Sequence, residues 1–154
     1  MITTVVRPRL PRAVLGERLA GWLEEGVAAR RPAEDDPATA AVVLVPEYLR
    51  ACPRSVLTDL AGTDWTGTVV AIVGYGGRTR GRYAIEDARE VLETAGAQVL
   101  ETSLGLDTAR IRAEGVDQAD VLLRDVLLDQ VASGYVRTSA ERTYGTPARP
   151  TPPG

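Results

Sequence analysis

The stretch that decides the fold is TVVAIVGYGG, residues 68–77. Its first six residues are all apolar or β-branched, which is the pattern of a strand buried on both faces of a parallel sheet. Three of the next four residues are glycine, which favours a loop over the interior of a helix or strand. We therefore expect a strand over residues 68–73 that opens into a glycine-rich loop over residues 74–81.

The segments on either side alternate between strand-like and helical patterns. On the N-terminal side, residues 40–45 form a second continuous apolar run, and residues 56–60 suggest a short helix. On the C-terminal side, apolar residues recur at helical spacing over residues 84–95, and residues 98–104 indicate a third buried strand. Gly96 fits the C-terminal cap of that helix.

The two ends of the chain continue the alternation. Residues 3–6 are a β-branched run, and a helical stripe follows from Pro11. Its apolar positions are Leu15, Leu19, Trp22, Leu23 and Val27. Residues 116–131 predict a last amphipathic helix.

The resulting order is β-α-β-α-β-α-β-α, which predicts parallel strands with helices on both faces of the sheet. We assign residues 1–137 to one α/β domain. Residues 138–154 are polar and rich in Pro and Gly, so we expect a disordered tail there.

Composition excludes several kinds of chemistry. The chain of 154 residues has no His, and all 18 of its basic residues are Arg. Imidazole catalysis, a His-ligated metal and a Lys Schiff base are therefore excluded within this chain, and we assign no catalytic acid or base and no metal ligand. The formal net charge of −3 offers no global attraction for nucleic acid.

Cys52 is the one cysteine, so no disulfide forms within the chain. With no His to activate it, we interpret this thiol as a buried structural group. The N-terminus lacks the apolar run of a signal peptide, and no stretch approaches the roughly 20 apolar residues of a membrane span. We expect a cytoplasmic protein without a membrane partner.

Ligand sites in open parallel sheets lie at the carboxyl ends of the strands. Three of the predicted strands end in segments of unusual composition, namely Arg7-Pro8-Arg9, Pro46-Glu47-Tyr48 and the glycine-rich loop from Gly74. Because the strands are parallel, these segments are expected to converge on one edge of the sheet.

Two of these segments carry a family resemblance. The sequence VLVPEY at residues 43–48, Pro53, and VVAIVGYGG at residues 69–77 together resemble the core of the NADPH-dependent FMN reductase family. The resemblance implies a flavodoxin-like three-layer sandwich with a parallel sheet of four to five strands. It also implies bound FMN, NAD(P)H as co-substrate, and hydride transfer through the flavin to a small-molecule electron acceptor.

The resemblance places the flavin ring between the second and third strand ends. The residues it implies there are Pro46, Glu47, Tyr48, Leu49, Gly74, Tyr75, Gly76, Gly77 and Arg78. Glycine permits close approach of the backbone to a flat ring, and Tyr48 or Tyr75 is a candidate to stack on a ring face.

The first strand end departs from the family pattern. The family has a Gly-Ser phosphate loop there, whereas this chain has RPRLPRA at residues 7–13, with two prolines that lack an N–H and no hydroxyl. Arg7, Arg9 and Arg12 are candidates to hold the phosphate by charge and bidentate hydrogen bonds. The alternative is that they are a solvated face or an interface, in a non-catalytic partner subunit that has lost flavin binding.

Residues 30–39 are too few for a helix-to-strand crossover that includes the usual edge strand of such relatives. A sheet of four strands, where relatives have five, would expose the flank of the first strand. We therefore expect a homo- or hetero-oligomer.

Overall fold

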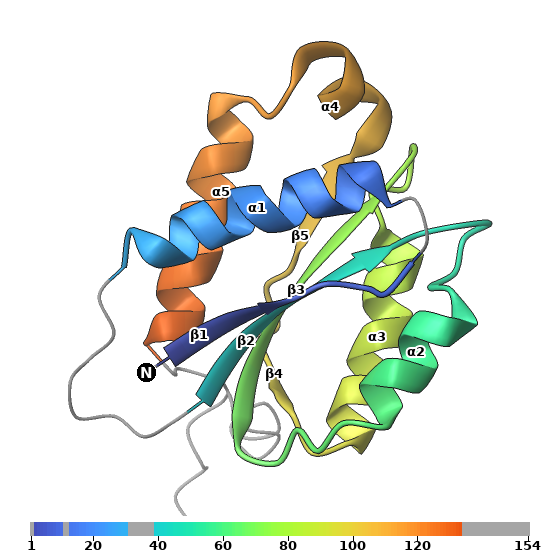
Figure 1. The fold of residues 1–154 in the computed structure, drawn as a ribbon, viewed down its shortest axis with the longest axis vertical. Coiled ribbons are helices and arrows are strands. Elements are labelled where there is room, and N and C mark those ends of the chain that lie inside the picture. The colour runs from blue at the N-terminus through green and yellow to red at the C-terminus, as the bar shows by residue number, and fades with distance from the viewer. Residues whose placement is uncertain (1, 11–12, 31–38, 134–154) are drawn as a thin grey trace, which may run out of the picture.

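The computed structural model describes residues 2–10, 13–30 and 39–133 (Figure 1). The strands are β1 (Ile2–Val6), β2 (Thr39–Pro46), β3 (Thr68–Gly76), β4 (Gln98–Val99) and β5 (Leu104–Asp107). The helices are α1 (Val14–Ala28), α2 (Arg54–Ala61), α3 (Arg82–Thr94), α4 (Thr108–Glu114) and α5 (Gln118–Ala132). The expected tail at residues 138–154 lies outside the described residues.

All strand pairs in the sheet are parallel, in the order β1-β2-β3-β4, and β5 also pairs with β3. Val99 of β4 pairs with Val70, and Leu104 of β5 pairs with Val73. β4 and β5 are thus two pieces of one interrupted edge strand, so five strands fill four positions. The expectation of a parallel sheet of four to five strands is confirmed.

Helices cover both faces of the sheet, as the alternating pattern predicts. On one face, α1 and α5 bury residues such as Leu23 and Leu127 against Val42 of β2. On the other face, α2 and α3 bury residues such as Leu60 and Leu92 against neighbouring positions of β2 and β3. Successive strand residues point to opposite faces, which explains the continuous apolar runs of the two central strands.

The connection through α1 has the opposite hand from the next two. Both β1-α1-β2 and β2-α2-β3 step the same way along the sheet, but α1 and α2 lie on opposite faces (Figure 1). Since α3 shares the face of α2 and nearly all such crossovers are right-handed, the α1 connection is the left-handed exception.

The structure differs from the expected elements at the end of β3, at the expected third strand and at α4. β3 continues through Gly76 and does not stop at Val73. The third buried strand, expected over residues 98–104, is broken at residues 100–103. The short helix α4 was not expected; Asp107 begins it, because its side chain accepts hydrogen bonds from the Ala109 and Arg110 amides.

The glycines within β3 have a packing reason. A Cβ on Gly74 would lie 2.6 Å from Cγ1 of Ile85 and 2.9 Å from the Gly81 carbonyl oxygen, and one on Gly76 would lie 3.0 Å from Cβ of Glu47. The start of α3 therefore lies directly against the strand, and glycine is the residue that allows this approach.

Candidate functional site

The carboxyl ends of β1, β2, β3 and β5 meet at one edge of the sheet because the strands are parallel. The segments that follow them come from distant parts of the sequence. The second and third of the segments singled out from the sequence are in contact there, whereas β1 ends level with Val43, three residues before the end of β2.

Glu47, at the end of β2, holds the start of α3. Its carboxylate accepts hydrogen bonds from the backbone amides of Tyr83 at 2.8 Å and Ala84 at 3.4 Å, and from the hydroxyl of Thr79. A carboxylate at a helix N-terminus satisfies free amides and opposes the positive end of the helix dipole. Glu47 therefore fixes the glycine-rich loop relative to β2, and both of its oxygens are used within the protein.

The residues after Glu47 form a tight, exposed turn. Tyr48 and Ala51 exchange backbone hydrogen bonds, and between them Leu49 and Arg50 have φ angles of +50° and +60°. Left-handed backbone is costly for residues other than glycine, and such strain tends to collect at functional sites. Tyr48 is 60% exposed and Leu49 is fully exposed, so the turn presents two apolar side chains to solvent.

The loop between β3 and α3 has an open end and a closed end. Gly77 and Arg78 are exposed, and a Cβ on Gly77 would have no atom within 4 Å. At the other end, Arg80 and Gly81 have positive φ, and the carbonyl oxygen of Arg80 comes so close to Gly105 that a Cβ there would lie 2.6 Å away. The backbone at Gly77 is therefore accessible to a flat ligand, whereas the backbone at Arg80 and Gly81 packs against β3 and β5.

Tyr75 does not face this edge. It is 6% exposed, and its hydroxyl lies against Gly16 of α1, where an added Cβ would be 2.6 Å from it. Burial raises the pKa of Tyr75 to about 12, with smaller contributions from Tyr48, Cys52 and Glu17. Of the two aromatic residues considered for ring stacking, Tyr48 is the exposed one.

Arg7 is turned onto α1. Its guanidinium forms ion pairs with Glu17, at 2.5 Å, and with Glu24. Glu17 lies in the first turn of α1, the place where a helix would otherwise bind an anion with its free amides. The structure therefore pairs Arg7 with two carboxylates of α1, and the phosphate-binding role of Arg7 stays a prediction.

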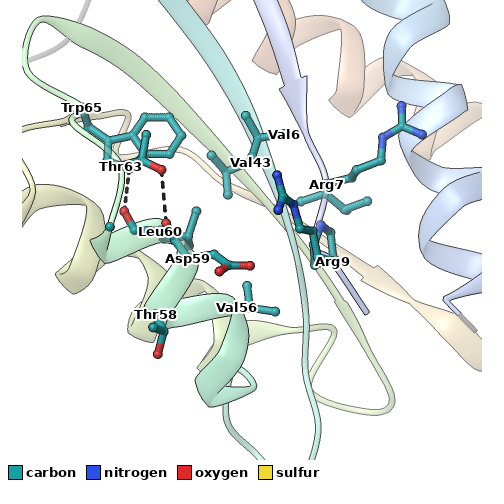
Figure 2. Close-up of a pocket in the computed structure, with 13 residues that line it drawn as sticks. Val6, Arg7, Arg9, Val43, Val56, Thr58, Asp59, Leu60, Thr63 and Trp65 are labelled. Carbon is teal, nitrogen blue, oxygen red and sulfur yellow. Dashed lines mark hydrogen bonds between the residues drawn. The ribbon is translucent and has the colours of Figure 1, made fainter. Parts of the chain in front are cut away.

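Arg9 is exposed and lies over a pocket, while Arg12 is outside the described residues. The pocket has a volume of about 360 Å³ and lies between β1 and α2. Val6, Val43 and Trp65 line its apolar floor, and Asp59 stands on the α2 side. Figure 2 shows Arg7 and Arg9 leaving the loop in different directions, Arg7 toward α1 and Arg9 toward the pocket.

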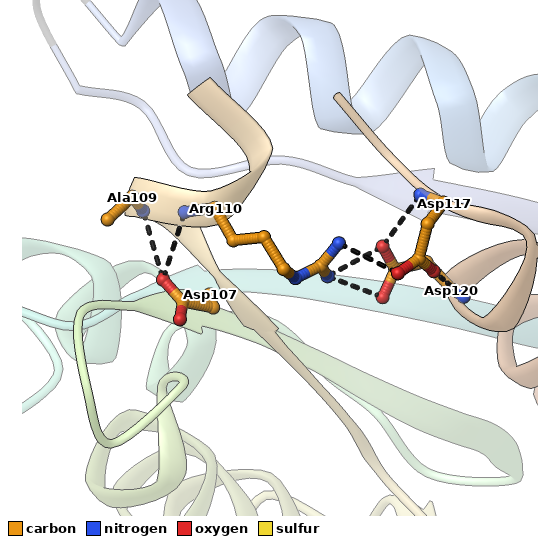
Figure 3. A network of polar contacts seen from close by, with 5 residues as sticks. All are labelled: Asp107, Ala109, Arg110, Asp117 and Asp120. Atoms are coloured by element: carbon orange, nitrogen blue, oxygen red, sulfur yellow. Dashed lines mark hydrogen bonds and ion pairs between the residues drawn. The ribbon is translucent and has the colours of Figure 1, made fainter. Parts of the chain in front are cut away.

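An ionic network joins the end of β5 to α5 (Figure 3). Arg110 of α4 donates to both carboxylate oxygens of Asp120, at 2.8 and 2.7 Å, and to Asp117 at 3.1 Å. Asp117 and Asp120 also form a capping box at the start of α5. The hydrogen bonds that Arg110 donates to Asp120, and the negative charges of Asp120, Asp117 and Asp107, raise the pKa of Arg110. The amide of Asp120 is the main group that lowers the pKa of Asp117.

This network was missed from the sequence. The hydroxyl of Thr108 donates to the carbonyl oxygen of Gly76 at 3.0 Å, so α4 also supports the end of β3. The spacing of Asp117 and Asp120 just before an apolar run is a helix-start signal that indicates the cap. The reach of Arg110 across the turn has no such signal.

Cys52 is buried, as the sequence led us to expect. Burial, with a smaller contribution from Asp87, raises the pKa of its thiol to about 12. Its amide donates to Asp87 Oδ2 at 3.0 Å, which ties the exposed turn to α3. The thiol is therefore unsuited to act as a nucleophile at neutral pH.

Membrane-spanning helices and metal-binding clusters were sought in residues 2–10, 13–30 and 39–133. No helix in these ranges has the length and apolar character needed to cross a membrane. In the same ranges, no three His, Cys, Asp or Glu side chains are grouped so that they could hold a metal ion.

No protein-family model matches this chain, and no curated protein sequence matches it. Solved structures do match, and they define the class of fold as flavodoxin-like. Because their sequence identities are low, the likeness extends to the fold alone.

Three solved structures illustrate the match. An NADH:FMN oxidoreductase (EMOB) in its apo form has a TM-score of 0.66 and 14% identity, over 91% of this chain and 92% of its own. A short-chain flavodoxin associated with a non-canonical PDU bacterial microcompartment has a TM-score of 0.61 and 18% identity, over 87% and 99%. A Fusobacterium nucleatum flavodoxin bound to flavin mononucleotide has a TM-score of 0.61 and 13% identity, over 86% and 98%.

Proposed function

We propose that this chain is a flavin-dependent NAD(P)H oxidoreductase that holds the flavin ring between the Tyr48–Ala51 turn and Gly77. The observation that carries the proposal is the strained, exposed turn beside an accessible glycine backbone. Its position at the carboxyl edge of a flavodoxin-like sheet supports this use, because ligands of open parallel sheets bind at that edge.

The residues present fit the ring better than they fit its phosphate. Tyr48 and Leu49 offer exposed apolar surface, and Gly77 allows the close approach that a flat ring needs. In contrast, Glu17 and its ion pair with Arg7 disfavour an anion at the start of α1. The proposed binding energy therefore comes mainly from the isoalloxazine ring. Of the three arginines of the first loop, Arg9 stays the candidate for the phosphate, because Arg7 is paired with Glu17 and Glu24 and Arg12 lies outside the described residues.

The protein's contribution to the reaction is binding and orientation. Bound flavin would supply the chemistry, accepting hydride from NAD(P)H and passing electrons to a small-molecule acceptor. Glu47 fixes the two loops relative to each other, and Asp87 holds the turn through the amide of Cys52. No side chain needs to transfer a proton for this role, so the absence of His from the sequence is compatible with it.

A matched pair of glycine variants tests the proposal. Gly77 and Gly21 both have open space around an added Cβ and neither has a positive φ, so the two positions are matched for the addition of a side chain. Gly77→Leu is expected to weaken riboflavin binding at least tenfold, measured by quenching of flavin fluorescence, while Gly21→Leu leaves it unchanged. Equal affinities in the two variants would contradict the proposed site.

A second candidate function is favoured by the Arg7 ion pairs. If the carboxylate of Glu17 marks a lost cofactor site, the chain is a non-catalytic partner of another subunit. This candidate predicts that wild-type protein binds neither riboflavin nor FMN. The oxidoreductase instead requires that bound flavin be bleached by NADH or NADPH under anaerobic conditions.

A further inference from the structure

β1 is an edge strand that, within the described part of the chain, lacks the usual protection. Its outer side has no partner strand among residues 2–10, 13–30 and 39–133. The sequence ITTVV contains no charge, no proline and no glycine, and its pairing with β2 runs through all five residues without a bulge. Charges, prolines, bulges and short length are the devices that keep edge strands from pairing with other chains.

The opposite edge of the same sheet is protected. β4 has two residues and β5 has four, with residues 100–103 breaking the ladder between them. Arg89 donates to the carbonyl oxygens of Leu100 at 2.8 Å and Glu101 at 3.2 Å, so part of the break is already hydrogen-bonded. The two edges thus differ in the features that prevent association, although they belong to one sheet.

The sheet differs at β1 from the order that is usual for its fold. Flavodoxin-type sheets have the order 2-1-3-4-5, with a strand outside the first one. Without that strand, α1 would stay on its face of the sheet but would lead to the strand on the other side of β1. A connection of this kind is left-handed, as it is here. The same loss would leave β1 and the nearby face of β2 uncovered, where the pocket of about 360 Å³ lies against Val6, Val43 and Val56.

We infer that β1 pairs with β1 of a second copy of this chain, in an antiparallel ladder about a two-fold axis at Thr4. A two-fold axis perpendicular to a sheet produces an antiparallel pair, and a two-fold dimer is the commonest oligomer. β1 suits self-pairing because no like charges would stand opposite each other, and Thr opposite Thr is a favourable cross-strand pair.

The pairing also accounts for the pocket. Cross-strand neighbours stand on the same face of a sheet, so the partner residue opposite Val6 would stand beside the pocket that Val6 lines. The ladder of residues 2–6 ends before Pro8, which lacks the N–H needed to continue it. This interface lies away from the Tyr48–Ala51 turn, and the inference does not depend on flavin binding.

Complementary charges at Thr4 test the inference. Thr4 is exposed, so lysine or glutamate is tolerated there by the folded chain. Light scattering should give wild-type protein twice the 16.4 kDa mass of one chain. Thr4→Lys and Thr4→Glu should each raise the dimer dissociation constant about tenfold or more, because like charges face each other across the axis. An equimolar mixture of the two variants should recover the dimer.

Thr94→Lys is the matched control, since Thr94 is exposed on α3. It should leave the dimer intact, and circular dichroism should show all variants folded. Hydrogen exchange should show that the outward amides of β1 lose protection on dilution to monomer. A monomeric wild-type protein, a dimer that both Thr4 variants keep, or a mixture that stays monomeric would each overturn the inference.

Discussion

At the scale of single residues, the site is defined by which charges are already paired. Arg7 is the first cation after β1, and the loop sequence makes it a candidate for binding phosphate. The structure instead directs its guanidinium to Glu17 and Glu24. Glu17 lies in the first turn of α1, so removal of its charge should make that helix start more favourable for an anion.

Glu17→Gln is accordingly expected to strengthen FMN binding about two- to five-fold while leaving riboflavin binding unchanged. Only FMN carries the phosphate that senses this charge. Parallel fluorescence titrations with both flavins measure the effect, and Glu24→Gln serves as the control because Glu24 lies beyond the first turn of the helix. An equal gain for riboflavin would show that the carboxylate acts on the ring.

Gly74 and Gly77 make a second matched pair. An added Cβ at Gly74 would meet Ile85 and the Gly81 carbonyl below 3.0 Å, whereas one at Gly77 would meet nothing within 4 Å. Gly74→Ala should therefore lower the free energy of unfolding by about 1–3 kcal/mol, and Gly77→Ala should change it by less than about 0.5 kcal/mol. Urea denaturation measures both, and similar values would refute the proposed reason for glycine in β3.

At the scale of elements, the α4–α5 corner depends on one buried carboxylate. Asp120 is 7% exposed and accepts hydrogen bonds from Arg110 and from the Asp117 amide. Asp120→Asn is expected to cost about 2–3 kcal/mol of unfolding free energy, because it leaves the guanidinium of Arg110 partly unpaired. Asp129→Asn, which alters an exposed ion pair with Arg30, should cost under about 1 kcal/mol. Urea denaturation would reject this ranking if the two costs were equal.

The sequence predicts most elements of this fold because hydrophobic periodicity is a local signal. The continuous apolar runs of β2 and β3 are visible without tertiary information. The extension of β3 through Gly76 is not visible, because it depends on contact with Ile85 and Glu47 from other elements. The break between β4 and β5 is not visible either. Arg89 donates a hydrogen bond to the carbonyl oxygen of Leu100 there, but nothing in the sequence around Arg89 indicates this contact.

The candidate site, too, could be predicted from the sequence only where local patterns determine it. The strand ends and their convergence could be predicted from the alternating pattern and parallel pairing. The burial of Tyr75 and the ion pairs of Arg7 could not, because side-chain direction depends on the position of α1. Sequence patterns therefore locate the edge, and packing decides which of its residues are free to bind a ligand.

At the scale of the whole molecule, stability should depend on pH in the alkaline range. The folded-state pKa of Cys52 is raised from 9.0 to about 12, and that of Tyr75 from 10.0 to about 12, chiefly by burial. The neutral forms are favoured in the folded protein, so their contribution is full below pH 9 and is lost as the pH rises toward 12. Thermal unfolding should show a falling melting temperature over this window, and Cys52→Ala should reduce the fall near its start. A flat profile would contradict the burial of these groups.

The molecule is proposed to bind a flavin mainly through its ring. The most direct measurement is an equilibrium titration of the wild-type protein with riboflavin and with FMN, followed by flavin fluorescence at constant salt. Both flavins should bind, with dissociation constants within about threefold of each other, since Glu17 and Arg7 leave little attraction for phosphate. Binding of neither flavin would contradict the claim, and so would an FMN affinity that exceeds that of riboflavin a hundredfold.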